Sequence, residues 1–153
     1  MYYLFYTVIS FFLLSCSWTP APTNPPSLAS ISQSTLSFST DQGSVVFNVE
    51  LAKTFTERQN GLMRRASLPK QSGMLFFFAS EDDQKFWMKD TWIPLDMIFM
   101  DHDWTVVGMV ENAEPNTIAL RSISKPSRYV LEINGGLAKQ RGIKAGTKAT
   151  FTP

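Results

Sequence analysis

The sequence predicts a mostly β domain of the α+β class, a bent antiparallel sheet or small barrel with one or two short helices. Short apolar runs recur from residue 33 onward, turn-forming residues separate them, and helix signals are few and brief. The chain has 153 residues, close to the ~150 residues typical of one domain. We therefore expect residues 33–153 to form a single β-rich globular domain.

A hairpin opens this predicted domain. Residues 36–40 and 44–51 flank Asp41-Gln42-Gly43, a sequence typical of a turn. Apolar and other side chains alternate along residues 45–51, as they do in a strand with one buried face. Two adjacent antiparallel strands should follow from this pattern.

Helix signals occur at two places. Thr54 and Glu57 match a capping box, in which each side chain accepts a backbone N–H of the other residue. This motif predicts a short helix over residues 55–63, weakened by Gly61. Glycines bound a second short helix predicted over residues 137–141.

Six other short segments have the length and apolar content of strands. They are residues 73–78, 85–89, 95–100, 104–110, 129–133 and 149–151. Pro115 and Pro126 mark a long connection between the fourth and fifth of them. Long connections in compact domains are often functional.

The N-terminus has the features of a lipoprotein signal peptide. Residues 1–15 are apolar and uncharged, but a membrane-spanning helix needs about 20 residues. They end in Leu13-Leu14-Ser15-Cys16, which resembles a bacterial lipobox, and Cys16 is the single cysteine. We predict lipidation of Cys16; the alternative is a chance thiol in an uncleaved N-terminus, since Lys and Arg are missing before it.

Residues 16–32 would tether the domain to a lipid surface. They combine the lipidated cysteine with a proline- and serine-rich stretch that cannot form a packed element. Ser17 after the cysteine predicts a bacterial envelope lipoprotein on the periplasmic face of the outer membrane, with the membrane as its partner. The charge balance, 14 basic against 13 acidic residues, argues against a nucleic-acid partner.

Four motifs, in chain order, carry a resemblance to a known family. They are Glu57-Arg58 with Gly61-Leu62-Met63; Gly73-Met74-Leu75-Phe76; Phe86-Trp87-Met88-Lys89-Asp90-Thr91 with Ile93-Pro94-Leu95-Asp96-Met97; and Val130-Leu131-Glu132 with Gly135. Over about residues 46–151 the chain resembles the domain of unknown function 192 family. The resemblance implies a small β-rich domain, exported or tethered in prokaryotes, and implies no particular activity.

Asp96 is the most informative residue of the third motif, because it lies on an apolar face of a predicted strand. An unpartnered buried carboxylate is costly, so Asp96 must find donors or lose its charge. One interpretation is that it accepts backbone N–H groups from the loop of residues 90–94. The other is that Asp96, Asp90, Glu132 and Lys89 converge at one mouth of the sheet as a polar pocket.

The leading functional hypothesis is a non-enzymatic binding or accessory module with a small polar and aromatic pocket. Its ligand would be a small molecule or an envelope protein. The residues predicted to bind it are Lys89, Asp90, Trp92, Asp96, Glu132 and Arg58. The plainer alternatives are that the tryptophan packs in the core or at its rim, and that the arginine lies on a solvated face.

An enzyme is the competing hypothesis. Asp96 and Glu132 could act as general acid and base on an envelope glycan or a similar small substrate. One histidine and one cysteine supply too few groups for a Ser-His-Asp, Cys-His or zinc site. No cofactor is expected.

A second alternative is periplasmic Cu(I) binding through methionine, because thioethers suit soft metal ions. Met100 lies two residues before His102, the single histidine, and these two form the one plausible ligand pair. The other methionines fall in apolar strands and at a helix end, where methionine usually fills the core.

Overall fold

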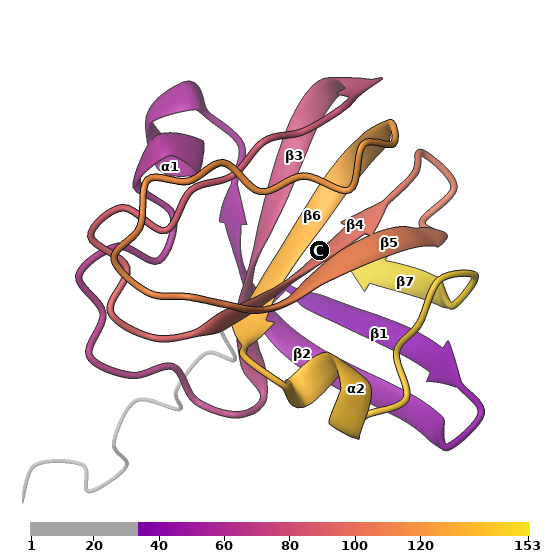
Figure 1. The fold of residues 1–153 in the computed structure, drawn as a ribbon. Coiled ribbons are helices and arrows are strands. Elements are labelled where there is room, and N and C mark those ends of the chain that lie inside the picture. Colours follow the sequence, from indigo (N-terminus) through magenta and orange to yellow (C-terminus); the bar gives the residue numbers. More distant parts are fainter. Residues whose placement is uncertain (1–33) are drawn as a thin grey trace, which may run out of the picture. The chain divides into compact units, whose positions relative to one another are not determined.

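The computed structural model describes residues 34–153, which form seven strands and two short helices (Figure 1). In chain order these are β1 (Thr35–Thr40), β2 (Gly43–Ala52), α1 (Phe55–Asn60), β3 (Ser72–Asp82), β4 (Leu95–Met100), β5 (Val106–Ala113), β6 (Ser127–Asn134), α2 (Leu137–Gln140) and β7 (Lys148–Thr152). The signal peptide, Cys16 and the tether predicted from the sequence lie outside the described residues.

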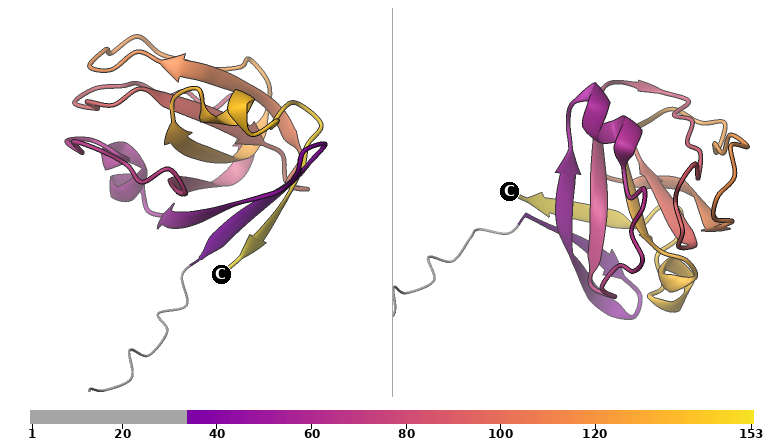
Figure 2. Two further views of the ribbon diagram at one scale, coloured as in Figure 1. Left: turned by 90° about the horizontal axis from the view of Figure 1, so that it is seen from below. Right: turned by 90° about the vertical axis from the view of Figure 1, so that its left-hand side faces the viewer.

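The strands form one curled sheet in the order β5-β4-β6-β3-β2-β1-β7 (Figures 1 and 2). The two ends of the sheet approach each other, and the Val106 N–H donates to the Thr147 carbonyl at 2.9 Å. A single bridge pairs Thr105 with Lys148 at the same place. The sheet is therefore a half-barrel, which confirms the predicted fold class.

One strand pair differs from the antiparallel arrangement that we expected. β2 and β3 are parallel, whereas the other neighbouring strands are antiparallel. Residues 53–71, which include α1, carry the chain from the end of β2 back to the start of β3, as a parallel connection requires. The long crossover places α1 beside the sheet.

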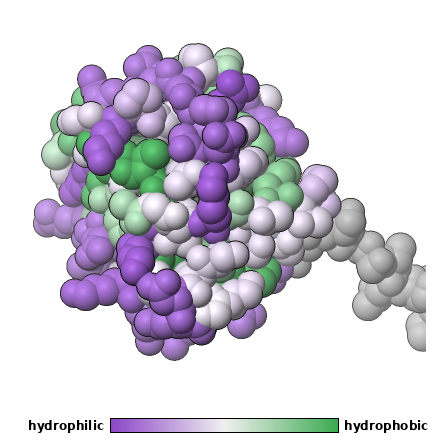
Figure 3. Space-filling model, turned by 90° about the vertical axis from the view of Figure 1, so that its right-hand side faces the viewer, coloured by the Kyte–Doolittle hydropathy of each residue, from purple (hydrophilic) through white to green (hydrophobic). Residues whose placement is uncertain are grey.

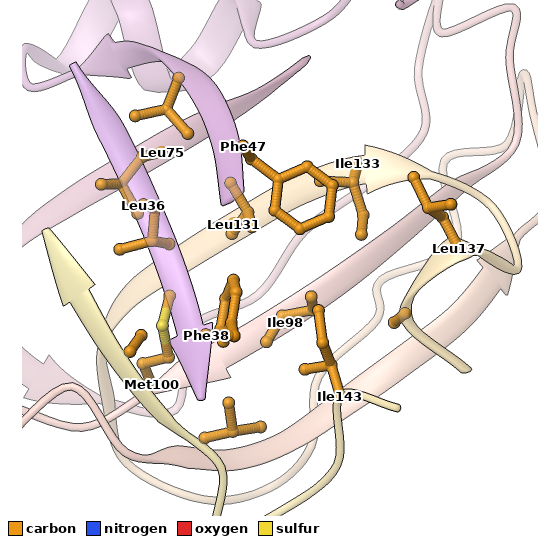
Figure 4. Close-up of a cluster of buried hydrophobic side chains, with 14 residues drawn as sticks. Leu36, Phe38, Phe47, Leu75, Ile98, Met100, Leu131, Ile133, Leu137 and Ile143 are labelled. Atoms are coloured by element: carbon orange, nitrogen blue, oxygen red, sulfur yellow. The ribbon is translucent and has the colours of Figure 1, made fainter. Parts of the chain in front are cut away.

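The hydrophobic core has two parts, one on each face of the sheet. The inner cluster lies between the two arms of the half-barrel and includes α2 (Figure 4). It consists of Leu36, Phe38, Phe47, Val49, Leu75, Ile98, Met100, Val106, Leu131, Ile133, Leu137, Ala138, Ile143 and Ala149. Its large buried side chains come from both arms, so it holds the curled sheet together.

The outer cluster lies on the opposite face and is covered by the loops before β3 and β4. It consists of Ala52, Leu62, Leu68, Met74, Phe76, Phe86, Met88, Leu95, Met97, Phe99, Ala113 and Val130. Successive residues of β4 alternate between the two clusters, Ile98 inward and Phe99 outward. β4 is therefore buried on both faces along its whole length.

Two local predictions need correction and one is confirmed. Residues 85–89 are a loop with one bridge, Phe86 to Arg121, and not a strand. The first helix ends at Asn60 rather than residue 63, because Gly61 has a positive φ of 46°. The capping box is present, with the Thr54 side chain accepting from the backbone N–H of Glu57 at 3.2 Å.

The face of the molecule that Figure 3 shows is mainly hydrophilic, with small, separate apolar areas. The most exposed large apolar side chains belong to α1 and to the loops before β4 and β6: Phe55, Trp92, Ile118 and Leu120. In the left view of Figure 2, these loops and α1 lie at the same side of the molecule. Within residues 34–153, no helix has the length and apolar character needed to cross a membrane.

Candidate functional site

A cleft of about 320 Å³ opens between α1 and the loop that precedes β4. α1 and the turn after it form one wall, β3 contributes part of the lining, and residues 85–87 form another wall. Five aromatic side chains line the cleft, and together they are called the aromatic wall: Phe55, Phe76, Phe78, Phe86 and Trp87. The space is large enough for a small organic molecule.

Glu132 is the acidic residue among the side chains that line this cleft. It lies on β6, opposite Met74 of β3 on one side and Met97 of β4 on the other. Its side chain is buried, with 4% exposed, and none of the residues 34–153 forms a hydrogen bond with its carboxyl group. Burial raises the pKa of Glu132 to about 8, so the group is mostly a neutral acid at pH 7.

The backbone leaves room in front of this carboxyl group. Gly61 follows α1, and a β-carbon at this position would lie 3.7 Å from Oε2 of Glu132 and 3.3 Å from the Phe76 ring. A larger side chain at Gly61 would therefore crowd both the acid and the aromatic wall. Its positive φ independently favours glycine.

Arg58 lines the same cleft from α1. Its Nη1 donates to the carbonyls of Lys53 and Phe77, the latter at 3.1 Å. Its guanidinium also lies over the Phe78 ring, 5.3 Å from the centroid. These contacts fix the arginine along the cleft wall and join α1 to the middle of β3.

Asp96 lies on the other face of the sheet. Its backbone pairs with Ile133, whereas Glu132 pairs with Met97, so the two acids point to opposite sides. The Asp96 carboxylate is fully buried and accepts the backbone N–H groups of Asn112, Gly136 and Ala138, at 2.7, 2.8 and 2.8 Å. The structure does not bring Asp96 and Glu132 together as an acid pair.

The donors to Asp96 also correct one sequence-based interpretation. It does accept backbone N–H groups, but they come from β5 and from the start of α2, not from the loop of residues 90–94. Its role is to hold α2 and β5 to the start of β4. This saturates the carboxylate, because three charge-assisted hydrogen bonds replace the water lost on burial.

The other predicted pocket residues lie on a surface loop outside the cleft lining. Asp90 has a positive φ of 52°, accepts the Arg64 N–H at 2.7 Å through its carbonyl, and lies 3.5 Å from the Arg64 guanidinium. Lys89 is over the Trp87 ring, 5.8 Å from the centroid. Trp92 is 54% exposed.

Of the six residues predicted to bind a ligand, Arg58 and Glu132 line the cleft. Sequence reasoning missed the four phenylalanines that line the cleft, and Lys85, which also lines it. Phe55 offered a signal, since a phenylalanine in the first turn of a short helix has few neighbours to bury it. It is 71% exposed in the structure.

Met100 and His102 occupy different environments. Met100 is fully buried in the inner cluster, whereas the exposed His102 lies with its Nδ1 2.9 Å from Oε1 of Glu81. This hydrogen bond raises the pKa of His102. No group of three or more His, Cys, Asp or Glu side chains within residues 34–153 is arranged to hold a metal ion.

Residues 37–151 match the family model described as DUF192, uncharacterised ACR. The chain belongs to the DUF192 family. The resemblance predicted from the four motifs is thus confirmed, and the match includes the cleft and the Asp96 site. No curated protein matches the chain.

Two solved structures resemble this DUF192 chain closely. One, from Sinorhizobium meliloti 1021 and named a "putative transcription regulator", shares 35% identity with a TM-score of 0.75, over 78% of this chain and 94% of that one. The other, a protein of unknown function from Novosphingobium aromaticivorans DSM 12444, shares 40% identity with a TM-score of 0.73, over 76% and 83% of the two chains. Both share the fold.

Proposed function

We propose that this DUF192 protein is a non-enzymatic binding module of the bacterial envelope that takes a small molecule in the cleft at Glu132. The observation that carries the proposal is the buried Glu132 carboxyl group, which lines the cleft and has no hydrogen bond from residues 34–153. A carboxyl group in apolar surroundings is costly unless it has a hydrogen-bond partner, so one that faces a cleft without a donor from these residues supports a ligand there.

The surroundings of Glu132 strengthen this argument. Its cross-strand neighbours, Met74 and Met97, belong to the outer core cluster, and an apolar side chain would pack between them without a polar group to desolvate. Glu132 therefore costs stability where a leucine or methionine would add it. Such a cost is typical of functional residues.

Binding of a small molecule, unlike acid–base catalysis, requires no second acidic group beside Glu132. Asp96 is saturated by backbone donors on the opposite face of the sheet, and the other charged side chains that line the cleft, Arg58 and Lys85, are cationic. A single neutral acid among aromatic rings suits recognition of a ligand's polar group.

Replacing Glu132 with leucine should separate binding from folding. The apolar surroundings predict that the Glu132→Leu variant stays folded and is at least as stable as the wild type, but loses binding by at least about tenfold. Binding would be measured by NMR on the full chain with a library of small-molecule fragments. A bound fragment should shift the signals of the Trp87 indole and the Gly61 amide.

A matched control is Glu114→Gln, which removes an exposed acid from the loop after β5 and should leave every fragment bound. Fragments that bind the Glu132→Leu variant as well as the wild type, or a library without a fragment that shifts these two signals, would contradict the proposed site.

The envelope location rests on the sequence features of residues 1–32. We expect metabolic palmitate label to appear on the chain in a bacterial host and to disappear in the Cys16→Ala variant, because acylation needs the cysteine thiol. Two or more acyl chains give stable anchorage, so the wild-type chain should also sediment with membranes. Label that persists in Cys16→Ala would remove the lipoprotein assignment.

A further inference from the structure

The chemical class of the ligand can be inferred from what surrounds Glu132, and this inference rests on the proposed function. We propose that the ligand is a small organic amine whose ammonium group pairs with the Glu132 carboxylate while its apolar or ring-shaped body lies against the aromatic wall. Neither the family description nor the two related structures assigns a ligand to this cleft.

Glu132 has no countercharge among the residues that line the cleft. Arg58 and Lys85 are the cationic side chains that line the cleft, and neither pairs with Glu132 within the described residues. Arg58 donates to two backbone carbonyls, and Lys85 lies 4.0 Å from Asp83. The strands beside Glu132 contribute methionine at the facing positions. An external cation would complete the site.

The aromatic wall offers a second attraction for a cation. The faces of aromatic rings attract cations, especially in a site shielded from water. The structure already uses this attraction beside the cleft, with Arg58 over Phe78 at 5.3 Å. The Phe76 and Phe86 rings, which also line the cleft, pack edge to face with centroids 5.2 Å apart. This contact keeps the wall in place for a ligand.

An anionic ligand fits these observations less well. It would need Arg58 to give up its carbonyl contacts, or Lys85, whose side chain is 58% exposed, to leave Asp83. It would also have to meet Glu132 as the protonated acid, because the ionised carboxylate repels an anion. An ammonium ligand needs neither rearrangement.

Binding of an amine involves one proton, and the atoms and charges balance. The neutral Glu132 acid meets R–NH₃⁺, loses its proton to solvent and remains as the carboxylate paired with R–NH₃⁺. Burial keeps the acid protonated up to a pKa of about 8, so complex formation releases a proton below that pH. Affinity should therefore rise with pH, about tenfold between pH 6 and pH 7.

Isothermal titration of the full chain with 2-phenylethylamine, 2-phenylethanol and 3-phenylpropanoate tests the inference, because these probes share a ring and differ in the polar group. We expect the amine to bind most tightly, about tenfold tighter at pH 7 than at pH 6. Titrations repeated in buffers of different ionisation enthalpy should show that close to one proton is released for each amine bound. Glu132→Gln should weaken binding by at least about tenfold and abolish the pH dependence.

Two further variants sharpen the test. Glu111→Gln removes an exposed acid from β5 and should bind like the wild type. Lys85→Ala removes a cation from the cleft lining, so amine affinity should stay the same or rise. An anion site would lose affinity in Lys85→Ala.

The failure of this inference is distinguishable from failure of the proposed function. If the propanoate or the alcohol binds more tightly than the amine and depends on Glu132, the amine inference is overturned but the cleft remains a binding site. If none of the three probes binds at millimolar concentration, both are overturned.

Discussion

Replacing Asp96 with asparagine should lower the free energy of unfolding by about 3 to 4 kcal/mol. The carboxylate accepts three backbone N–H groups, two at Oδ1 and one, from Ala138, at Oδ2. In asparagine, either an amide NH₂ faces one of these donors or the side chain turns and leaves others unpaired. Because Asp96 is fully buried, water cannot replace the lost acceptor.

Urea unfolding at pH 7, followed by tryptophan fluorescence, measures this change, with Glu114→Gln as a surface control that should shift stability by less than about 0.5 kcal/mol. Hydrogen exchange gives a local readout. The amides of Asn112, Gly136 and Ala138 should exchange faster in Asp96→Asn, because each loses or weakens its bond to the acceptor. A loss below about 1 kcal/mol would contradict the role assigned to Asp96.

The sequence contains enough information to predict most of the strands. Alternation identifies β2, and the short apolar run of residues 95–100 is too brief for a buried helix, so β4 is also predicted. The capping box at Thr54 and Glu57 marks the start of α1 because its two hydrogen bonds are local. The predictions of β2, β4 and the start of α1, which depend on near neighbours in the chain, are therefore confirmed.

The false strand at residues 85–89 shows the limit of alternation. Phe86 and Met88 are buried in the outer cluster while Trp87 and Lys89 face outward, which is the pattern of a strand. A loop that covers a hydrophobic cluster produces the same pattern without a partner strand. The parallel pairing of β2 with β3 was missed for a related reason, since the path of residues 53–71 is set by tertiary packing.

The candidate site could be predicted only in part because its geometry depends on strand register. Asp96 and Glu132 were both recognised as acids on apolar strands, but their relative placement follows from Met97 facing Glu132 across the β4–β6 pair. A shift of one residue would put both carboxyls on the same face. The donors to Asp96 lie 16 to 42 residues away in the chain, so no local pattern records them.

Replacing Glu132 with glutamine should remove a pH-dependent loss of stability. The pKa of Glu132 is raised from its ordinary value of 4.5 to about 8 in the folded chain. Below pH 4.5 both the folded and the unfolded chain hold the proton, so this contribution is constant. Between pH 4.5 and 8 the unfolded chain releases the proton and the folded chain keeps it, so stability falls as pH rises. Over that window the loss is about 4 kcal/mol.

Urea unfolding of the wild type and Glu132→Gln at pH 5 and pH 8 isolates this contribution, because other titrating groups cancel in the difference. The pKa of Glu50 is lowered by its hydrogen bond to Arg65, so its contribution to stability rises with pH, opposite to that of Glu132. This contribution is the same in both proteins and cancels in the difference. The variant should gain on the wild type as pH rises, whereas a difference that stays constant would mean that Glu132 acquires a countercharge within the chain. A bound amine would provide that countercharge from outside, so saturating 2-phenylethylamine should flatten the wild-type profile towards that of the variant.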